Sequence, residues 1–258
     1  MVTRYEAWLN KKSLSAIDPA IYILDIAYGE TRMATTLIDK SARNGQMVTD
    51  RRAQSTSVTI TFEIHEQDVA RRREVCGRVQ AWAMGGGVLT TNDRRGQRLN
   101  VICDAPPSVG SALKWTQALK VTFTAYEQPF WEDEYPRSVT MSGSNAKKSL
   151  YAPGFGAVAR VWAEVKNTSG KAIDALTIKA GGTTFEFAGL GLAAGQTLEV
   201  LYDESGMLVI RAGGVSKMAK RTATSNDELA VKTGETSEFS VQADGDVSAV
   251  FKVRGLYL

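Results

Sequence analysis

Three adjacent carboxylates, Glu132, Asp133 and Glu134, are the residues of this chain whose types and spacing come nearest to a catalytic site. They follow two aromatic residues, Phe130 and Trp131, in the stretch AYEQPFWEDEYP. A glycosidase uses two carboxylates across a sugar ring, and aromatic side chains can stack on that ring. In such pairs, however, the acids usually differ in environment, so that one is desolvated and its pKa is raised. Three consecutive acids are therefore expected to face water or a basic neighbour such as an arginine of another subunit, and catalysis is not expected.

The other reactive side chains are too few and too scattered to complete a site. His65 is the only histidine, so any triad would have to use it, yet no partner for a triad stands near it in the sequence. One histidine with two distant cysteines, Cys76 and Cys103, does not make a zinc site. The glycine pattern GFGAVA opens an alternating strand rather than a helix, so it does not predict dinucleotide binding. We therefore expect no enzyme activity, no cofactor and no metal.

Composition and charge also narrow the class of protein to which this chain can belong. The 258 residues suffice for two domains, and 43% of them are hydrophobic, which is typical of a globular protein. No apolar run reaches the length of a membrane helix, and the start lacks the apolar region of a secretory signal. The net charge of +3 does not favour a dedicated nucleic-acid binder. Four arginines of one segment (Arg71, Arg72, Arg73 and Arg78) more simply predict a solvated helix face or a subunit contact, although nucleic-acid contact stays an alternative.

The first half of the chain predicts strands around one helix. The run TSVTITFEI alternates strictly, which is typical of a half-buried strand. From about 68 to 84 the apolar residues recur at helical spacing, and GGG ends the helix. We expect four residues of this helix to be buried against the sheet: Val69, Cys76, Val79 and Trp82.

The second half predicts strands only. Residues 127–156 hold three of six prolines and the polar run SGSNAKK, which indicates an inter-domain connection. A hairpin over 176–187 turns at Gly181-Gly182, and a second pairs Val200 with Ile210. A third is expected to turn near Asp244-Gly245 and to pair Val241 with Val247. Short strands joined by tight turns predict a sandwich or a jelly roll.

The order of these elements resembles that of the distal tail proteins of long-tailed, non-contractile bacteriophages (Dit-like proteins of siphophages). The resemblance rests on strands, the segment TSVTITFEIHEQDVARRREVCGRVQAWAMGGG, the polar turn TNDRRGQ, and a strand that runs into Pro129, Phe130 and Trp131. It implies a mainly β protein in three parts. Residues 1–130 would form a tail-tube-like β-sandwich with one helix, 131–156 a linker, and 157–258 a galectin-like or jelly-roll sandwich resembling a carbohydrate module.

The resemblance also implies a function. Six copies would close into a ring that joins the tail-tube protein to the tail-tip hub protein, with DNA passing through. Receptor-binding proteins are further partners, membrane insertion is not expected, and the place is the virion tail tip, assembled in the host bacterial cytoplasm. Exposed polar strand residues are candidates for the ring interface: Thr56, Ser57, Thr59, Thr61 and Glu63. Pro129, Phe130 and Trp131 are expected to pack at the domain seam.

The alternative is a carbohydrate-binding protein of the host-surface adhesion type that uses the C-terminal sandwich. It would need exposed aromatic side chains on one concave sheet. Four aromatics are available there, Trp162, Phe185, Phe187 and Tyr202. Three of the four fit the predicted core faces.

Overall fold

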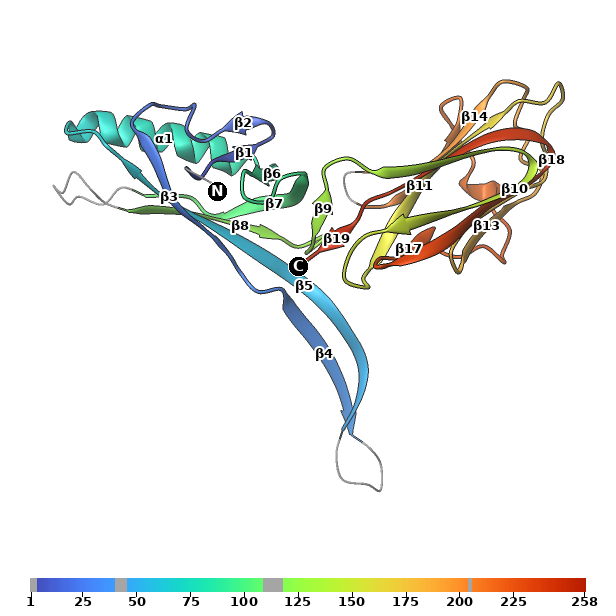
Figure 1. Ribbon diagram of the computed structural model, residues 1–258, viewed down its shortest axis with the longest axis horizontal. Coiled ribbons are helices and arrows are strands. Elements are labelled where there is room, and N and C mark those ends of the chain that lie inside the picture. Colours follow the sequence, from blue (N-terminus) through green and yellow to red (C-terminus); the bar gives the residue numbers. More distant parts are fainter. Residues whose placement is uncertain (1–3, 40–45, 109–117, 204–205) are drawn as a thin grey trace. The chain divides into compact units, whose positions relative to one another are not determined.

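The computed structural model describes residues 4–39, 46–108, 118–203 and 206–258 (Figure 1). It divides into two compact units, residues 1–132 with Leu258 and residues 133–257, which we call unit 1 and unit 2. The protein is mainly β, with one α-helix, α1, in the described part of the chain. The predicted fold class is therefore confirmed.

Unit 1 is built on one antiparallel sheet with strand order β2-β1-β6-β7-β8-β5-β3. The alternating run lies in β5, where its four apolar residues (Val58, Ile60, Phe62 and Ile64) are buried. Helix α1 (Val69–Met84) begins where the Asp68 side chain accepts a hydrogen bond from the Ala70 amide, and its C-cap is Gly85. The strands of unit 1 are β1 (Ala7–Leu9), β2 (Lys12–Ser13), β3 (Ile21–Tyr28), β4 (Arg32–Asp39), β5 (Gln46–Ile64), β6 (Gly87–Thr91), β7 (Gln97–Ala105) and β8 (Leu119–Ala125).

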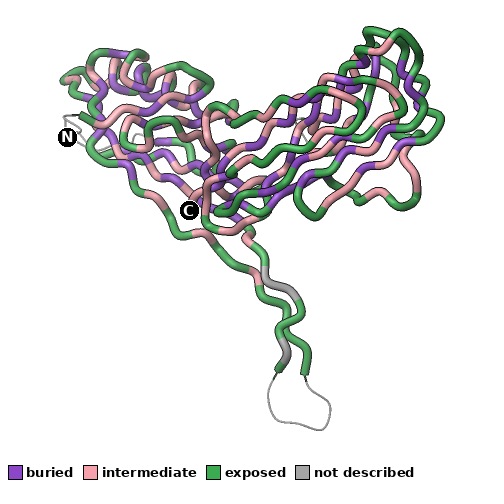
Figure 2. The backbone as a smooth tube through the Cα atoms, turned by 45° about the vertical axis from the view of Figure 1, so that its right-hand side comes forward, coloured by how far each residue is buried: buried purple, intermediate pink, exposed green. Residues whose placement is uncertain are grey.

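The first part of β5 leaves this sheet and pairs with β4 alone. The register runs from Arg32 opposite Ser55 to Asp39 opposite Gln46. We call these paired strands, residues 32–39 and 46–55, the arm. Figure 2 shows most of the described residues of the arm in the colour of exposed residues.

Unit 2 is organised by two long strands that pair along their whole length, β10 (Arg137–Ala152) and β18 (Glu235–Val253). This folded ribbon bends over at an irregularity between Gly143 and Asn145 (Figure 1). One half of β18 pairs with β12 and the other half with β11, so the ribbon belongs to both layers of a sandwich. The remaining elements are β9 (Trp131–Asp133, across the unit division), β11 (Val158–Asn167), β12 (Leu176–Ala180), β13 (Thr183–Phe187), β14 (Thr197–Tyr202), β15 (Leu208–Ala212), β16 (Val215–Ser216), the 3₁₀ turn η1 (Met218–Lys220), β17 (Ala230–Lys232) and β19 (Leu256–Tyr257).

The structure corrects two expectations about this half. Most of the predicted linker, 131–156, is strand β10, and its polar residues belong to a sheet edge rather than to a connection. Val241 and Val247 do not pair with each other, because they lie in different layers and pair with β12 and β11 respectively. The other two hairpins are confirmed, with Ile178 opposite Phe185 and Val200 opposite Ile210.

Candidate assembly surfaces

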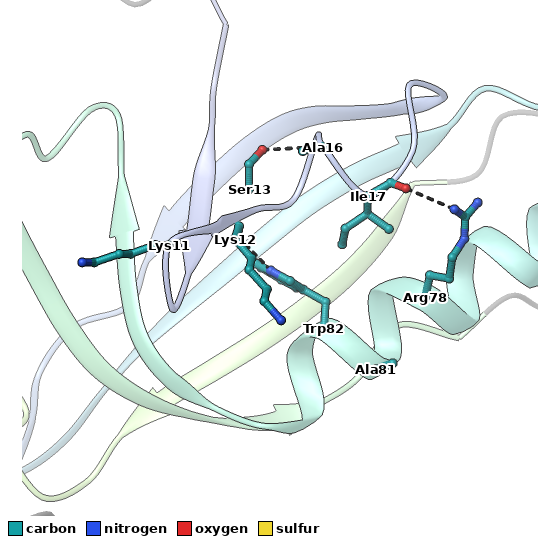
Figure 3. Close-up of a pocket in the computed structure, with 8 residues that line it drawn as sticks. All are labelled: Lys11, Lys12, Ser13, Ala16, Ile17, Arg78, Ala81 and Trp82. Atoms are coloured by element: carbon teal, nitrogen blue, oxygen red, sulfur yellow. Dashed lines mark hydrogen bonds between the residues drawn. The ribbon is translucent and has the colours of Figure 1, made fainter.

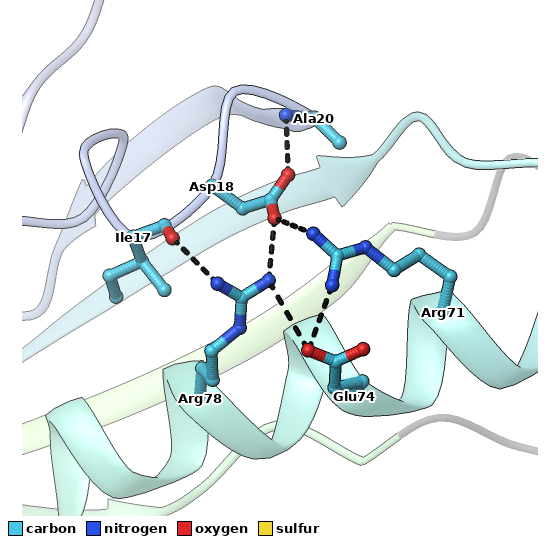
Figure 4. A network of polar contacts seen from close by, with 6 residues as sticks. All are labelled: Ile17, Asp18, Ala20, Arg71, Glu74 and Arg78. Carbon is cyan, nitrogen blue, oxygen red and sulfur yellow. Dashed lines mark hydrogen bonds and ion pairs between the residues drawn. The ribbon is translucent and has the colours of Figure 1, made fainter.

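A buried carboxylate fastens the loop before β3 to helix α1 (Figure 4). Asp18, only 5% exposed, accepts hydrogen bonds from Arg78 Nη2 at 2.6 Å and Arg71 Nη2 at 3.0 Å. Glu74 accepts another from Arg71 at 2.8 Å. The hydrogen bond from the Ala20 amide, with smaller contributions from the two guanidinium groups, lowers the pKa of Asp18 below its ordinary value. Two of the four predicted surface arginines are therefore tied to a buried acid.

The third arginine of that set also departs from the expectation of a solvated face. Arg72 is only 6% exposed and lies on the buried side of α1 with Val75 and Ala83. The burial of Arg72 was not predicted from helical spacing, because that spacing is read from apolar residues. The long aliphatic stem of an arginine can nevertheless lie along an apolar surface while its charged end points elsewhere. The helix face predicted to be solvated thus includes side chains that hold α1 in place.

The predicted helix core is confirmed at two positions and incomplete at two. Cys76 and Val79 are buried, whereas Val69 and Trp82 are half-buried. The Trp82 indole packs edge-on to Phe123 at 5.8 Å between ring centroids, and its Nε1 donates to the Lys12 carbonyl at 2.9 Å. An indole N–H needs an acceptor, and here the acceptor is a backbone carbonyl of strand β2.

A pocket of about 660 Å³ opens beside Trp82, between the first strands and α1 (Figure 3). Arg78 lines it, but its guanidinium turns to the Ile17 carbonyl, which accepts a hydrogen bond at 3.2 Å. In Figure 3 the Lys11 side chain extends away from the other lining residues. The pocket therefore does not gather its cations around one point, and it carries no catalytic group.

The five predicted ring residues lie on a central strand rather than at an edge. Residues 56–64 of β5 pair with β8 on one side and β3 on the other. Thr56 lies on the face of the buried residues and is itself buried, with its hydroxyl donating to the Gly29 carbonyl at 3.3 Å. The other four (Ser57, Thr59, Thr61 and Glu63) share the opposite face and are half-buried. Their use as a ring interface stays a prediction.

The arm exposes apolar side chains that the sequence did not single out. Leu37 lies directly opposite Val48, and the two side chains are 48% and 56% exposed. Ile38 and Met33 on β4 are exposed as well. A two-stranded ribbon is marginal in water without a surface to pack on. The arm is therefore the part of unit 1 with the most to gain from contact with another polypeptide.

The segment of aromatic and acidic residues, 129–134, is more buried than expected. Pro129 and Trp131 are buried and Phe130 is half-buried. Within unit 1 the Trp131 ring packs edge-on to Tyr28 at 5.6 Å, with the Arg94 guanidinium 5.0 Å from its centroid. Their place at a domain seam stays a prediction.

Two of the three acids are largely shielded from water, and each of them lies beside an arginine, as the expectation of a basic neighbour allows. The Glu132 side chain is 13% exposed and pairs with Arg98 at 3.1 Å. Asp133 accepts hydrogen bonds from the Gly255 amide and the Tyr257 hydroxyl, both at 2.9 Å. Burial, followed by the nearby Asp133, raises the pKa of Tyr257 to about 12. Each acid meets its own donors, so burying one does not require burying all three.

The remaining candidates for chemistry form no site. His65 stacks on Tyr22 at 4.3 Å and pairs with Glu63 at 2.9 Å, so its ring faces no nucleophile. Within the described ranges no group of three or more His, Cys, Asp or Glu residues could hold a metal ion. None of the helices in those ranges is long and apolar enough to cross a membrane. Phe185 and Phe187 are buried and Trp162 and Tyr202 are half-buried, so these four side chains do not form an exposed row of aromatics for a sugar.

The sequence matches no protein-family model, and a search of curated proteins gives no significant match. Solved structures do match, and they are hub and baseplate proteins of phage tails. SPP1 Dit, described as a paradigm of the hub adsorption apparatus in phages that infect Gram-positive bacteria, aligns over 97% of this chain and 98% of its own, with a TM-score of 0.73 and 10% identity.

Two structures of the phage P2 baseplate in its activated conformation also align along the whole chain. The one with Ca covers 99% of this chain and 98% of that chain, with a TM-score of 0.55 and 8% identity. The one with Sr covers 97% of each, with a TM-score of 0.51 and 8% identity. At these identities the likeness defines the fold, so this chain has the two-unit fold of Dit.

Proposed function

We propose that this chain is a structural, non-enzymatic protein of a phage tail tip. The observation that carries the proposal is the likeness to SPP1 Dit, which extends over both units rather than over one common sandwich. A shared β-sandwich alone would say little, because such folds serve many functions. An unusual pairing of two different units in one chain is a more specific signal.

The finer proposal is a ring of six copies closed through unit 1. The ring would join the tail-tube protein to the tail-tip hub protein, leave a passage for DNA, and offer unit 2 to receptor-binding proteins at the virion tail tip. The arm supports this proposal, because its exposed Leu37 and Val48 need a partner surface. A closed ring would also give that surface the same neighbour in every copy. Thr59 and Thr61 on the polar face of β5 remain the candidates for contacts along the ring.

Electron microscopy tests the ring directly. Rings with six-fold symmetry, in the purified chain at high concentration or in isolated tail tips, are the expected result. A tail tip in which this chain has a symmetry that is neither six-fold nor three-fold would contradict the proposal. A carbohydrate-binding role would instead be supported by a glycan array that gives specific binding, which the buried Phe185 and Phe187 make unexpected.

A further inference from the structure

Unit 2 treats two of its sheet edges very differently, and one of them is sealed. Strand β13 lies at one end of the strand order. The loop beside β13 forms hydrogen bonds to the outward-facing amide and carbonyl of two of its residues, Thr184 and Glu186. The Thr184 amide donates to Asn226 Oδ1 at 2.7 Å and its carbonyl accepts from the Asn226 amide at 2.9 Å. The Glu186 amide donates to Ser225 Oγ and its carbonyl accepts from the Thr222 amide. No strand can be added there.

The other edge is β10, which is 16 residues long and pairs only with β18. Within the described part of unit 2, no further strand or loop backbone bonds to residues 138–151 of this strand. The bend divides this edge into two stretches, 137–143 and 145–152, that lie in different layers. An unpaired row of amides and carbonyls as long as either stretch is a template for another chain, and proteins usually shorten or cover such edges. Among the residues of unit 2 that the structure describes, the edge of β13 is covered by a loop, whereas the edge of β10 is left open. An open edge of this kind suggests a binding role.

One side chain, that of Lys148, contacts the backbone at the open edge. Lys148 lies opposite the buried Phe239, so it points toward the core side of its strand although it is exposed. From there its ammonium donates to the Thr140 carbonyl, 2.7 Å away on the other half of the fold-back.

The ladder register shows which way Thr140 faces. The Asn167 amide donates to the Gln196 carbonyl on the β14 side, so by alternation Glu164 of β11 turns its backbone groups toward Val250 of β18. Val250 therefore does not exchange bonds with its other partner, Thr140, whose amide and carbonyl face outward.

We propose that the β10 edge binds an extended segment of another protein by strand addition, and that the segment carries a carboxylate that meets Lys148. A neutral strand would displace the ammonium from Thr140 and give it nothing in return, whereas an acidic strand would replace the lost contact. Inward-pointing charges on edge strands are known to select against unwanted pairing in this way. A second copy is disfavoured, because antiparallel pairing of the same edge would bring Lys147 and Lys148 toward the same residues of its partner.

The proposal does not depend on the ring, since it concerns unit 2 of a single chain. The test uses the full chain and two labelled nine-residue peptides of alternating threonine and valine, one with a central glutamate and one with a central lysine. Fluorescence anisotropy should show binding of the glutamate peptide and about tenfold weaker binding of the lysine peptide. Lys148→Glu should reverse that order. Lys179→Glu is the control, because Lys179 is an exposed lysine on β12, whose two edges are both occupied.

A second variant tests the backbone. Thr140→Pro removes an outward amide that β18 does not use, and proline is tolerated on edge strands. Binding of the glutamate peptide should be lost while the circular dichroism spectrum and the melting temperature stay close to those of the parent. Equal binding of both peptides, or unchanged binding by Lys148→Glu, would overturn the proposal. So would concentration-dependent dimers in sedimentation that Thr140→Pro abolishes, because the occupant would then be a second copy.

Discussion

The arm of unit 1 and the folded ribbon of unit 2 are both long antiparallel pairs of strands, yet the ribbon buries its apolar side chains and the arm exposes them. The ribbon buries Met141, Phe239 and Phe251, whereas the arm leaves Leu37 and Val48 about half exposed. The difference lies in what each pair meets. The ribbon bends near Gly143, so its two halves face each other and share one core. The arm pairs with no further strand and has no opposite layer of its own.

This contrast shows that alternation decides which side chains share a face, but not whether that face is covered. In β18 the buried positions alternate with exposed or half-buried ones in the stretches that pair with β12 and with β11, which complete the two layers. In β4 nearly every residue is exposed whatever its polarity. A ribbon that folds over covers its apolar face with its own second half. An extended ribbon such as the arm needs another polypeptide to cover that face.

The largest expected effect comes from truncating the core of the ribbon. Phe251 is fully buried and packs on Phe239 at 5.4 Å between ring centroids. Phe251→Ala should lower the free energy of unfolding by about 3–5 kcal/mol, because it removes a buried ring and leaves a cavity. Chemical denaturation would measure the loss. A change below about 1 kcal/mol would mean that the two halves of the ribbon do not share a core.

The next effect concerns Asp18, which fastens a loop of unit 1 by charge rather than by a core. Asp18→Asn should cost about 1–2 kcal/mol, the lower part of the usual range, because Arg71 and Arg78 are about 40% exposed and solvent screens them. The pKa of this carboxyl is lowered, so its contribution is present above pH about 4 and is lost as the pH falls through the folded-state pKa.

Denaturation at several pH values would check this sign. Asp18→Asn should flatten the acid limb of the stability curve between pH about 2 and 5. An acid limb that is unchanged in the Asp18 variant would place the titrating group elsewhere.

A smaller effect is expected at the bend of the ribbon. Gly143 has a φ of +115°, a backbone angle that residues with a side chain rarely adopt. A Cβ atom added at this position would meet no other atom within 4 Å. Gly143→Ala should therefore cost about 1 kcal/mol through backbone strain alone. Gly170→Ala is the matched control, with equally open space and no positive φ. Equal stability of the two variants would show that the bend does not need glycine.

The arm should show the smallest change in stability and a large change in assembly. Leu37→Ser combined with Val48→Ser should alter the unfolding free energy of the monomer by less than about 0.5 kcal/mol, since both side chains are already exposed. Electron microscopy should then show that rings are lost, while Thr35→Ser on the same strand keeps them. If the double variant still forms rings, the arm is not the assembly element and the contrast with the ribbon loses its functional meaning.

Local signals in the sequence were sufficient where local contacts decide. The turn at Gly181-Gly182 predicted its hairpin because the two strands pair with each other directly. The turn signal at Asp244-Gly245 misled, because β18 continues through it as one strand that pairs with β12 before it and with β11 after it. Cys76 and Val79 were predicted correctly from helical spacing, whereas Trp82 was not, since its N–H must reach the Lys12 carbonyl.

The candidate surfaces were harder to predict than the fold. Asp18 is a single acid in a loop, and its partners Arg71 and Arg78 stand more than fifty positions further along the chain. No motif links such residues. The exposure of Leu37 could not be read either, because an apolar residue in a strand normally predicts burial. The contact of Lys148 with the backbone depends on a fold-back that brings Thr140 beside it, and its segment has the composition of a linker.

That linker-like composition has a consequence for synthesis on the ribosome. β10 is made first in unit 2 and must wait for β18, its only pairing partner, so roughly 4–17 s pass between Ala152 and Glu235 at about 5–20 residues per second. During that delay both sides of β10 are unpaired in a crowded cell. A strand rich in valine and phenylalanine would then be prone to aggregate, whereas serine, asparagine and the adjacent lysines Lys147 and Lys148 keep the nascent segment hydrated. The polar run thus suits a strand that must stay single until the rest of its sandwich has been translated.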